Sequence, residues 1–357
     1  MLILGIETSC DETAASVVRD GVEILSNVVV SQIDIFAEYG GVIPEVAARS
    51  HLEVMLPVVD KALADASCSW DEIDAIAVTH APGLLGSLLI GTLTARTLAV
   101  LHNKPLYAVH HLKSHVYANW LSNGANSSFY SAGLNKNQKL ATPCFPILAL
   151  VISGGHTQIL YMPGHNQFEI VGTTRDDAVG ECFDKVAKIL GLPYPGGPSI
   201  AKAALKGDPV KYQLPHPKVE GLDFSFSGLK TAVLRAVQKE LGLPISHPSH
   251  DLKNHLTPKQ VADFAASFQK TAIDILREKL EKAQDMYPDT KSTVVAGGVS
   301  ANKALREALP EAYFPAPALS GDNGAMVAAA CYFEVQSGVK PTDPYKLNIY
   351  PRISIEK

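Results

Sequence analysis

Two histidines stand four residues apart in the segment from His111 to His115, which reads HHLKSH from position 110. On a helix, positions i and i+4 share one face, so both imidazoles can bind one divalent metal ion. An isolated pair of this kind is more often two ordinary surface or core histidines. A zinc protease with an HExxH helix would need glutamate at position 112 as its general base, and Leu112 argues against that class.

A metal ion held by two histidines requires at least one carboxylate in addition. Asp322, in the segment 320–326 (SGDNGAM), is the candidate. Aspartate is also a favoured first cap of a helix, and the sequence alone makes that the stronger expectation for Asp322.

A second pair of carboxylates, Asp11 and Glu12, lies at the tip of the turn that follows the first predicted strand. In a cleft they can hold a metal-bound water or accept a proton. An acidic turn without a catalytic role is an equally good interpretation.

Three glycine-rich segments predict close backbone contact with a ligand. Because glycine has no Cβ, its backbone N–H groups can approach a phosphate or acyl group. Each segment alone is more often a simple turn, but three at predicted strand ends favour a nucleotide site. None matches the P-loop or the dinucleotide-binding fingerprint. The segments are 152–156 (ISGGH), 195–198 (PGGP) and 297–302 (GGVSAN).

Asp184 lies beside the apolar stripe of a predicted helix over 178–190 without belonging to that stripe. Its carboxylate can accept hydrogen bonds from the ribose hydroxyls of a nucleotide, or it can simply be solvated.

The elements that must position these residues form a pattern that occurs twice in the chain. The chain begins with one strand, a polar turn and two further strands, and the same pattern of strands begins again near residue 147. The pattern predicts two similar α/β halves with a cleft between them, where ligands bind at strand ends. The predicted strands are 2–7, 14–19, 22–30, 73–79, 106–109, 147–152, 157–162, 168–173 and 293–296. The predicted helices are 44–66, 87–101, 111–121, 178–190, 258–287, one after 298 and one after 324. Two polar surface insertions are expected at 122–144 and 244–257.

Composition excludes several classes of protein. The 357 residues, 46% of them hydrophobic and 19% charged, indicate a globular chain of two domains or lobes. The net charge of −5 argues against a generally basic nucleic-acid binder. We expect no transmembrane helix and no signal peptide, and hence no membrane partner. Five scattered cysteines without a CxxC motif favour reduced thiols in the cytoplasm.

The motifs together are more specific than any one of them. In chain order they are 5–13 (GIETSCDET), 40–45 (GGVIPE), 110–115 (HHLKSH), 153–157 (SGGHT), 196–198 (GGP), 223–230 (DFSFSGLK), 297–302 (GGVSAN) and 322–326 (DNGAM). With these eight motifs in this order, the chain closely resembles the bacterial tRNA N6-adenosine threonylcarbamoyltransferases, a universal family formerly called O-sialoglycoprotein endopeptidases. The resemblance runs from residue 1 to about residue 335, apart from the two insertions.

The resemblance implies a two-lobed α/β fold like that of actin, sugar kinases and heat-shock ATPases, built from duplicated ribonuclease-H-like domains. It implies an N-terminal lobe of residues 1–108 plus about 326–345, with partner-binding helices at about 44–66. Residues 109–325 would form a C-terminal lobe that carries the metal and adenylate sites.

The implied reaction transfers a threonylcarbamoyl group from threonylcarbamoyl-adenylate to N6 of the adenosine beside the anticodon, in tRNAs that read codons beginning with A. AMP is released. His111, His115 and Asp322 match the ligands of one divalent metal, with Fe²⁺ expected and Zn²⁺ as the alternative. The residues that match the adenylate site are Val151, Ile152, Ser153, Gly154, Gly155, Asp184, Gly197 and Asn302.

The resemblance also implies protein partners, namely a shorter paralogue that lacks the histidine pair and a small P-loop ATPase. The chain departs from the family pattern at Lys113-Ser114, where Glu-Gly is usual, and at Gly321, where Thr is usual. Two other interpretations remain: a sugar or acid kinase of the same fold, and a non-enzymatic scaffold. A kinase would not need the histidine pair, and a scaffold would not need to retain the three metal-ligand types.

Overall fold

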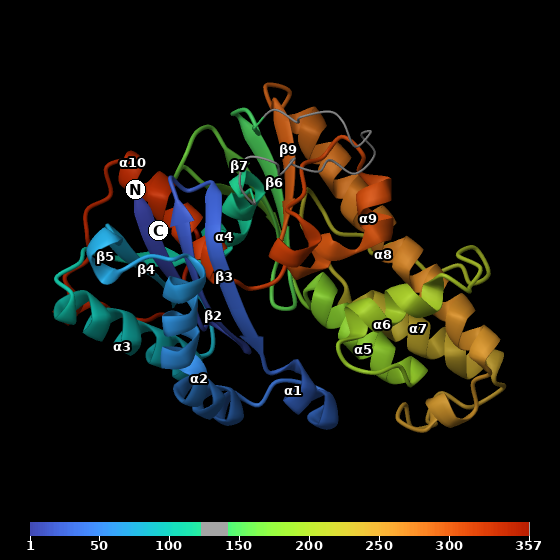
Figure 1. Ribbon diagram of the computed structural model, residues 1–357. Helices are drawn as coiled ribbons and strands as arrows, with labels where there is room; N and C mark the ends of the chain where they lie inside the picture. The colour runs from blue at the N-terminus through green and yellow to red at the C-terminus, as the bar shows by residue number, and fades with distance from the viewer. Residues whose placement is uncertain (123–141, 357) are drawn as a thin grey trace.

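The computed structural model describes residues 1–122 and 142–356, which form two lobes with one β-sheet in each (Figure 1). The insertion expected at 122–144 therefore lies almost entirely outside the described residues. The first sheet has the strand order β3-β2-β1-β4-β5, and the second has the order β8-β7-β6-β9. The strands are β1 Leu2–Glu7, β2 Glu12–Arg19, β3 Glu23–Ser31, β4 Ala75–Ala81, β5 Leu106–His110, β6 Ile147–Ile152, β7 Thr157–Met162, β8 Glu169–Thr173 and β9 Ser292–Ala296.

The second sheet repeats the topology of the first four strands of the first sheet, which confirms the predicted duplication. In the first sheet β1, β2 and β3 form an antiparallel meander, and β4 adds to the free side of β1 in parallel. In the second sheet β6, β7 and β8 form the same meander, and β9 pairs in parallel with β6. Each half is the ribonuclease-H-like unit, and the whole is the actin-like, sugar-kinase-like ATPase fold.

The helices fall into an inner and an outer set. Helices α4 and α10 lie between the two sheets and share one hydrophobic cluster with both of them. Helices α2 and α3 cover the outer face of the first sheet, and α5, α7 and α8 contribute to the outer cluster of the second sheet. The helices are α1 Ile33–Tyr39, α2 Pro44–Asp65, α3 Leu85–Leu101, α4 His111–Tyr117, α5 Val179–Leu190, α6 Gly196–Ala204, α7 Ser227–Glu240, α8 Pro258–Met286, α9 Lys303–Ala308 and α10 Gly324–Gln336.

Strand β6 shows how the sequence produces these layers. All six of its residues are fully buried. Ile147, Ala149 and Val151 belong to the inner cluster, whereas Leu148, Leu150 and Ile152 belong to the outer one. Successive side chains of a strand point to opposite faces, so a continuous apolar run is the signature of a strand covered on both sides.

The structure corrects two sequence expectations. Helix α4 ends at Tyr117 and continues as a 3-10 turn over Ala118–Trp120, short of the predicted end at 121. The glycine segment 195–198 does not follow a strand: it forms the beginning of α6, directly after α5. Two glycines and a proline are poor helix formers, so sequence propensity gave no sign of a helix there.

Among the described residues, no helix combines the length and the apolarity that a bilayer span requires.

A contact between two glycines brings α10 against β1. A Cβ on Gly5 would lie 2.1 Å from the carbonyl oxygen of Gly324, and a Cβ on Gly324 would lie 2.5 Å from that of Gly5. Only glycine permits this approach, because both neighbouring atoms belong to the backbone. It places the segment before α10, which carries Asp322, beside the end of β1, which carries Glu7.

Replacing Gly5 by alanine is therefore expected to lower the free energy of unfolding by about 3 kcal/mol, the upper part of the range for overpacking. Urea denaturation measures the change. Gly228→Ala is the matched control, because a Cβ at Gly228 meets nothing within 4 Å. Equal stability of the Gly5→Ala variant and the wild type would show that α10 can move away from β1 without cost.

Candidate functional site

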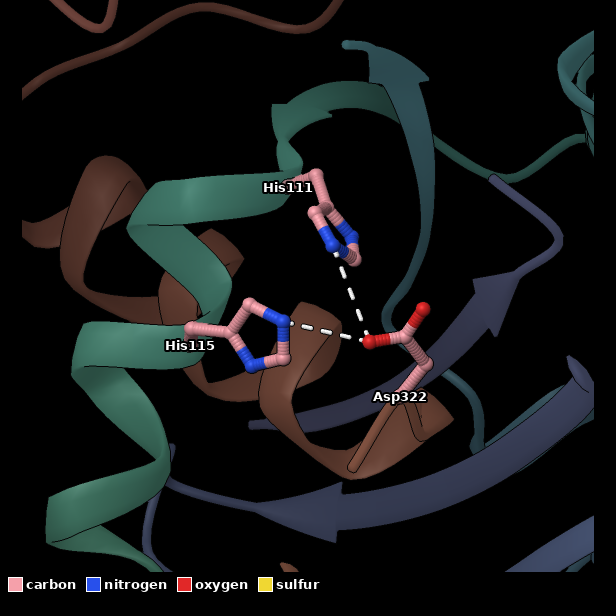
Figure 2. A group of neighbouring side chains, drawn as sticks. All are labelled: His111, His115 and Asp322. Atoms are coloured by element: carbon pink, nitrogen blue, oxygen red, sulfur yellow. Dashed lines mark ion pairs between the residues drawn. The ribbon is translucent and has the colours of Figure 1, made fainter. Parts of the chain in front are cut away.

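His111, His115 and Asp322 converge at one point between the lobes (Figure 2). His111 is the first residue of α4, immediately after β5, and His115 follows one turn later on the same face. The Nε2 atoms of His111 and His115 lie 3.6 and 3.1 Å from the same Asp322 oxygen, Oδ1. One ligand atom from each residue falls within 4.8 Å of the others. Two imidazoles and a carboxylate at this spacing can bind a divalent transition metal.

Asp322 does not cap α10, contrary to the expectation from its sequence context. The cap is Asn323, whose Oδ1 accepts a hydrogen bond of 3.0 Å from the backbone N–H of Met326. Since its neighbour satisfies the helix end, the Asp322 carboxylate is left for the two histidines.

His111 is oriented by a buried carboxylate that the sequence analysis did not select. Glu7 Oε2 lies 3.1 Å from His111 Nδ1 and accepts a hydrogen bond of 2.6 Å from Thr79 Oγ1. In the neutral ring, which is the form that binds a metal, a proton on Nδ1 donated to Glu7 leaves the lone pair of Nε2 free on the side of Asp322. Such a carboxylate–histidine pair commonly orients metal ligands. The signal that the sequence offered was an acidic residue at the end of an apolar strand. In the structure this residue is fully buried.

Among the residues that the structure describes, neither ring nitrogen of His115 has a hydrogen-bond partner, although only 1% of the residue is exposed. Its 3.1 Å approach to Asp322 is close, but it lacks hydrogen-bond geometry. A buried imidazole without a partner is costly, and a metal ion at Nε2 would satisfy one of its two nitrogens. The donor set and this unpartnered nitrogen both fit a divalent metal.

The electrostatics of the cluster favour a positive charge. Burial opposes protonation of His111, but Asp322 and Glu7 outweigh it and raise the pKa of His111 to about 9. Burial likewise opposes ionisation of Asp322, and the neighbouring His111 and His115 nevertheless lower its pKa to about 2. A bound cation would be stabilised by the same carboxylates.

The acidic turn lies close enough to be affected by this cluster. Glu12 is the first residue of β2, and its Oε1 accepts a hydrogen bond of 3.2 Å from Ser31 Oγ. Burial and the nearby charges of Asp322 and Asp11 raise the pKa of Glu12 well above its usual value. A carboxyl whose pKa lies closer to neutrality is better suited to proton transfer.

The three glycine segments converge around the end of β6 and the start of α5. The backbone N–H of Gly180 donates to Ser153 O at 3.3 Å, and that of Gly196 donates to Asp184 Oδ1 at 2.6 Å. Gly297, with φ +89°, lies so close to β6 that a Cβ would be 2.4 Å from Ile152 O. The segments therefore pack against one another or against α5.

Four other glycines of these segments face open space. A Cβ on Gly154, Gly155, Gly197 or Gly298 would meet no atom of the described part of the chain within 4 Å. Nothing in the packing of the protein requires glycine at these positions, whereas a ligand that approaches the backbone would require it. We refer to these four residues as the glycine cradle.

The remaining predicted substrate-binding residues differ in what they can offer. The side chains of Val151 and Ile152 are buried in the core, so only their backbone can face a ligand. Asp184 is not simply solvated: it accepts the hydrogen bond from Gly196, and burial raises its pKa. Asn302 caps α9 through Leu305 N at 3.2 Å and donates to Gln269 Oε1 at 2.9 Å, so its side chain already has partners.

Placing a side chain in the cradle tests whether it binds a ligand. Gly298→Val is expected to raise KM for the nucleotide substrate by about tenfold with little change in Tm, because the branched side chain occupies open space. Steady-state kinetics and thermal unfolding measure the two effects. Gly164→Val, in the turn at the opposite end of β7, is the matched control, since a Cβ there makes only ordinary contacts from 3.6 Å. An unchanged KM for Gly298→Val would contradict a ligand-binding role.

The fold and the site together define a class: a two-lobed protein of the actin-like ATPase fold, with a His/His/Asp cluster and a glycine cradle between its lobes. Within that class, the family model for tRNA N6-adenosine threonylcarbamoyltransferase matches residues 23–329. The chain belongs to this family.

Relatives bearing that name match nearly the whole chain. The protein from Thermomicrobium roseum is 45% identical and the alignment covers 95% of this chain and 93% of the relative. The protein from Symbiobacterium thermophilum is 47% identical over the same shares of the two chains. One from Bacillus cereus is 44% identical and covers 99% of this chain and 97% of its own.

Proposed function

We propose that this chain transfers the threonylcarbamoyl group of threonylcarbamoyl-adenylate to N6 of the adenosine adjacent to the anticodon, in cytoplasmic tRNAs that read codons beginning with A. The observation that carries the proposal is the convergence of His111, His115 and Asp322 on one point, in a chain of this family. We propose that these three residues hold one divalent metal, Fe²⁺ by expectation and Zn²⁺ as the alternative.

The reaction exchanges one bond of the carbamoyl carbon for another and moves one proton. The adenosine N6 attacks the carbamoyl carbon, the bond from that carbon to the phosphate oxygen breaks, and AMP leaves with the bonding electrons. A metal at the site supplies Lewis-acid stabilisation of the negative charge that develops on oxygen. The backbone N–H groups of the glycine cradle hold the phosphate. Glu12 or Asp11 accepts the proton that N6 loses.

The two lobes divide these tasks in the proposal. Residues 1–108 with about 326–345 would form the N-terminal lobe, and 109–325 the C-terminal lobe with the metal and adenylate sites. Glu12, from the first sheet, then approaches the substrate from the side opposite the glycine cradle. The net charge of −5 gives the whole chain no attraction for RNA, so the tRNA would be bound by a local surface or with the help of partner proteins.

We propose that helices α2 and α3 bind a partner protein, the shorter paralogue of this family. Leu52 and Leu56 on α2 are 68% and 58% exposed, and Leu85, Leu89 and Leu93 form an exposed stripe at intervals of four on α3. The two helices lie side by side along the first sheet (Figure 1). An exposed apolar patch of this kind is typical of a protein-binding surface. The small P-loop ATPase would complete the assembly.

The proposal is tested with the purified chain, its partner proteins, threonylcarbamoyl-adenylate, ATP and unmodified tRNA. Mass spectrometry of the digested tRNA is expected to detect threonylcarbamoyladenosine, and AMP should appear in equal amount. The kinase alternative predicts instead a phosphorylated small molecule and unmodified adenosine in the tRNA. That second result would overturn the proposal.

A further inference from the structure

The segment between α7 and α8, residues 244–257, is held firmly at the end of the second lobe that lies away from α4 (gold, Figure 1). Gln238 Nε2 donates hydrogen bonds of 3.1 Å to the carbonyl oxygens of both Ile245 and His247. Leu252 is fully buried in the outer hydrophobic cluster. Thr257 begins α8 with a capping box completed by Gln260. A surface loop anchored at its start, middle and end can hold side chains in fixed positions.

Two imidazoles in this loop converge on one carboxylate oxygen. His247 Nε2 lies 2.9 Å and His255 Nε2 3.0 Å from Asp251 Oδ2. Asn254 Nδ2 donates to the other oxygen, Oδ1, at 2.9 Å, which fixes the orientation of the carboxylate. One ligand atom from each of the three residues lies within 4.8 Å of the others. This is the same donor set as at the first site.

We infer that His247, Asp251 and His255 form a second binding site for a divalent transition metal, of the zinc type. Bonds of about 2.0–2.2 Å to a tetrahedral metal separate the ligand atoms by about 3.4 Å, so the distances of 2.9 and 3.0 Å from Asp251 to the two histidines need to lengthen only slightly. Two imidazoles select zinc-like ions over Mg²⁺ or Ca²⁺, which prefer oxygen ligands. Each imidazole would then carry its proton on Nδ1.

The exposure of the cluster defines the kind of site. The side chains of Asp251 and His255 are 37% and 46% exposed, so solvent can supply the fourth ligand. The site has three protein ligands from one loop of the second lobe and shares none with His111, His115 or Asp322. Its expected effect is to fix the loop that leads into α8.

The test compares the wild-type chain with the double variant His247→Ala/His255→Ala. Equilibrium dialysis at micromolar free Zn²⁺, followed by elemental analysis, gives the metal bound to each protein. The wild type is expected to bind about one equivalent more than the variant. His216→Ala is the matched control, since His216 forms a surface pair with Glu278 alone, at 3.2 Å, and it should bind as much zinc as the wild type. Because the result is a difference between proteins, it does not depend on what the first site binds.

Hydrogen exchange provides a second measurement, and it separates zinc binding from a difference in folding between the wild type and the variant. Zn²⁺ is expected to slow amide exchange in residues 247–255 of the wild type and to have no effect there in the variant, because a ligand stabilises the state that binds it. Equal zinc content in wild type and variant would overturn the inference. A difference that appears only at millimolar Zn²⁺ would also overturn it, as adventitious binding.

Discussion

Replacing His111 by alanine is expected to reduce threonylcarbamoyl transfer by at least about a thousandfold, because a Lewis acid contributes several kcal/mol to the transition state and each 1.4 kcal/mol is a factor of ten. The imidazole is one of two nitrogen ligands offered at the proposed metal site, 3.6 Å from Asp322. Its removal also leaves Glu7 without its histidine partner. Metal content, by elemental analysis, should fall together with the transfer rate.

Asp322→Asn provides a second variant for the case in which His111→Ala folds poorly. The amide has nearly the same shape as the carboxylate but is a weak metal ligand, and Asn323 still caps α10. We expect a similar loss of metal and activity with an unchanged circular dichroism spectrum. His216→Ala, on the surface, should retain both. Wild-type turnover by a folded Asp322→Asn protein would remove the metal cluster from the mechanism.

Replacing Glu12 by glutamine is expected to lower kcat by about a hundredfold, the lower end of the range for a general base. The substitution preserves the shape of the side chain and its contact with Ser31, but glutamine cannot take up the proton from N6. Metal content should be unchanged, which separates this effect from that of His111→Ala.

The pH dependence of kcat gives the more specific readout. A base must be unprotonated to act, so the wild-type rate should fall as the pH drops through the pKa of Glu12, which burial, Asp322 and Asp11 raise above its usual value. The Gln variant should lack this decrease. A decrease retained in the variant would assign the base to Asp11 or to another group, and full activity would exclude Glu12.

The sequence identifies the three residues that could bind a metal, but it does not show whether each of them is a ligand or has another role. The HxxxH spacing depends only on helix geometry, so the shared face of His111 and His115 was predictable. Asp322 was ambiguous because capping depends on the side chain of one residue, and here Asn323 takes that role. Glu7 was missed because its position beside His111 results from the assembly of distant strands in one sheet, and the two residues are 104 positions apart in the sequence.

The elements were predicted where the hydrophobic period was strong. Strands β1, β6 and β7 begin and end at the predicted residues, since each is a continuous apolar run or an alternating one bounded by polar turns. Helix α6 was missed because its sequence has low helix propensity and tertiary contacts hold its first turn. Gly196 packs on the backbone of Asp184, and its backbone N–H donates a hydrogen bond to the Asp184 carboxylate. Gly197 of the glycine cradle is the next residue, so the prediction failed at a segment where glycine is needed for the site and not for the helix.

The central claim is that transfer to tRNA occurs at a metal held by His111, His115 and Asp322, and metal depletion followed by titration tests it most directly. Chelator-treated wild-type protein, with its partners and threonylcarbamoyl-adenylate, should form no threonylcarbamoyladenosine. Added Fe²⁺ or Zn²⁺ should restore the rate in the wild type but not in His115→Ala at the same metal concentration. A metal-free wild-type protein that modifies tRNA at the full rate would contradict the account.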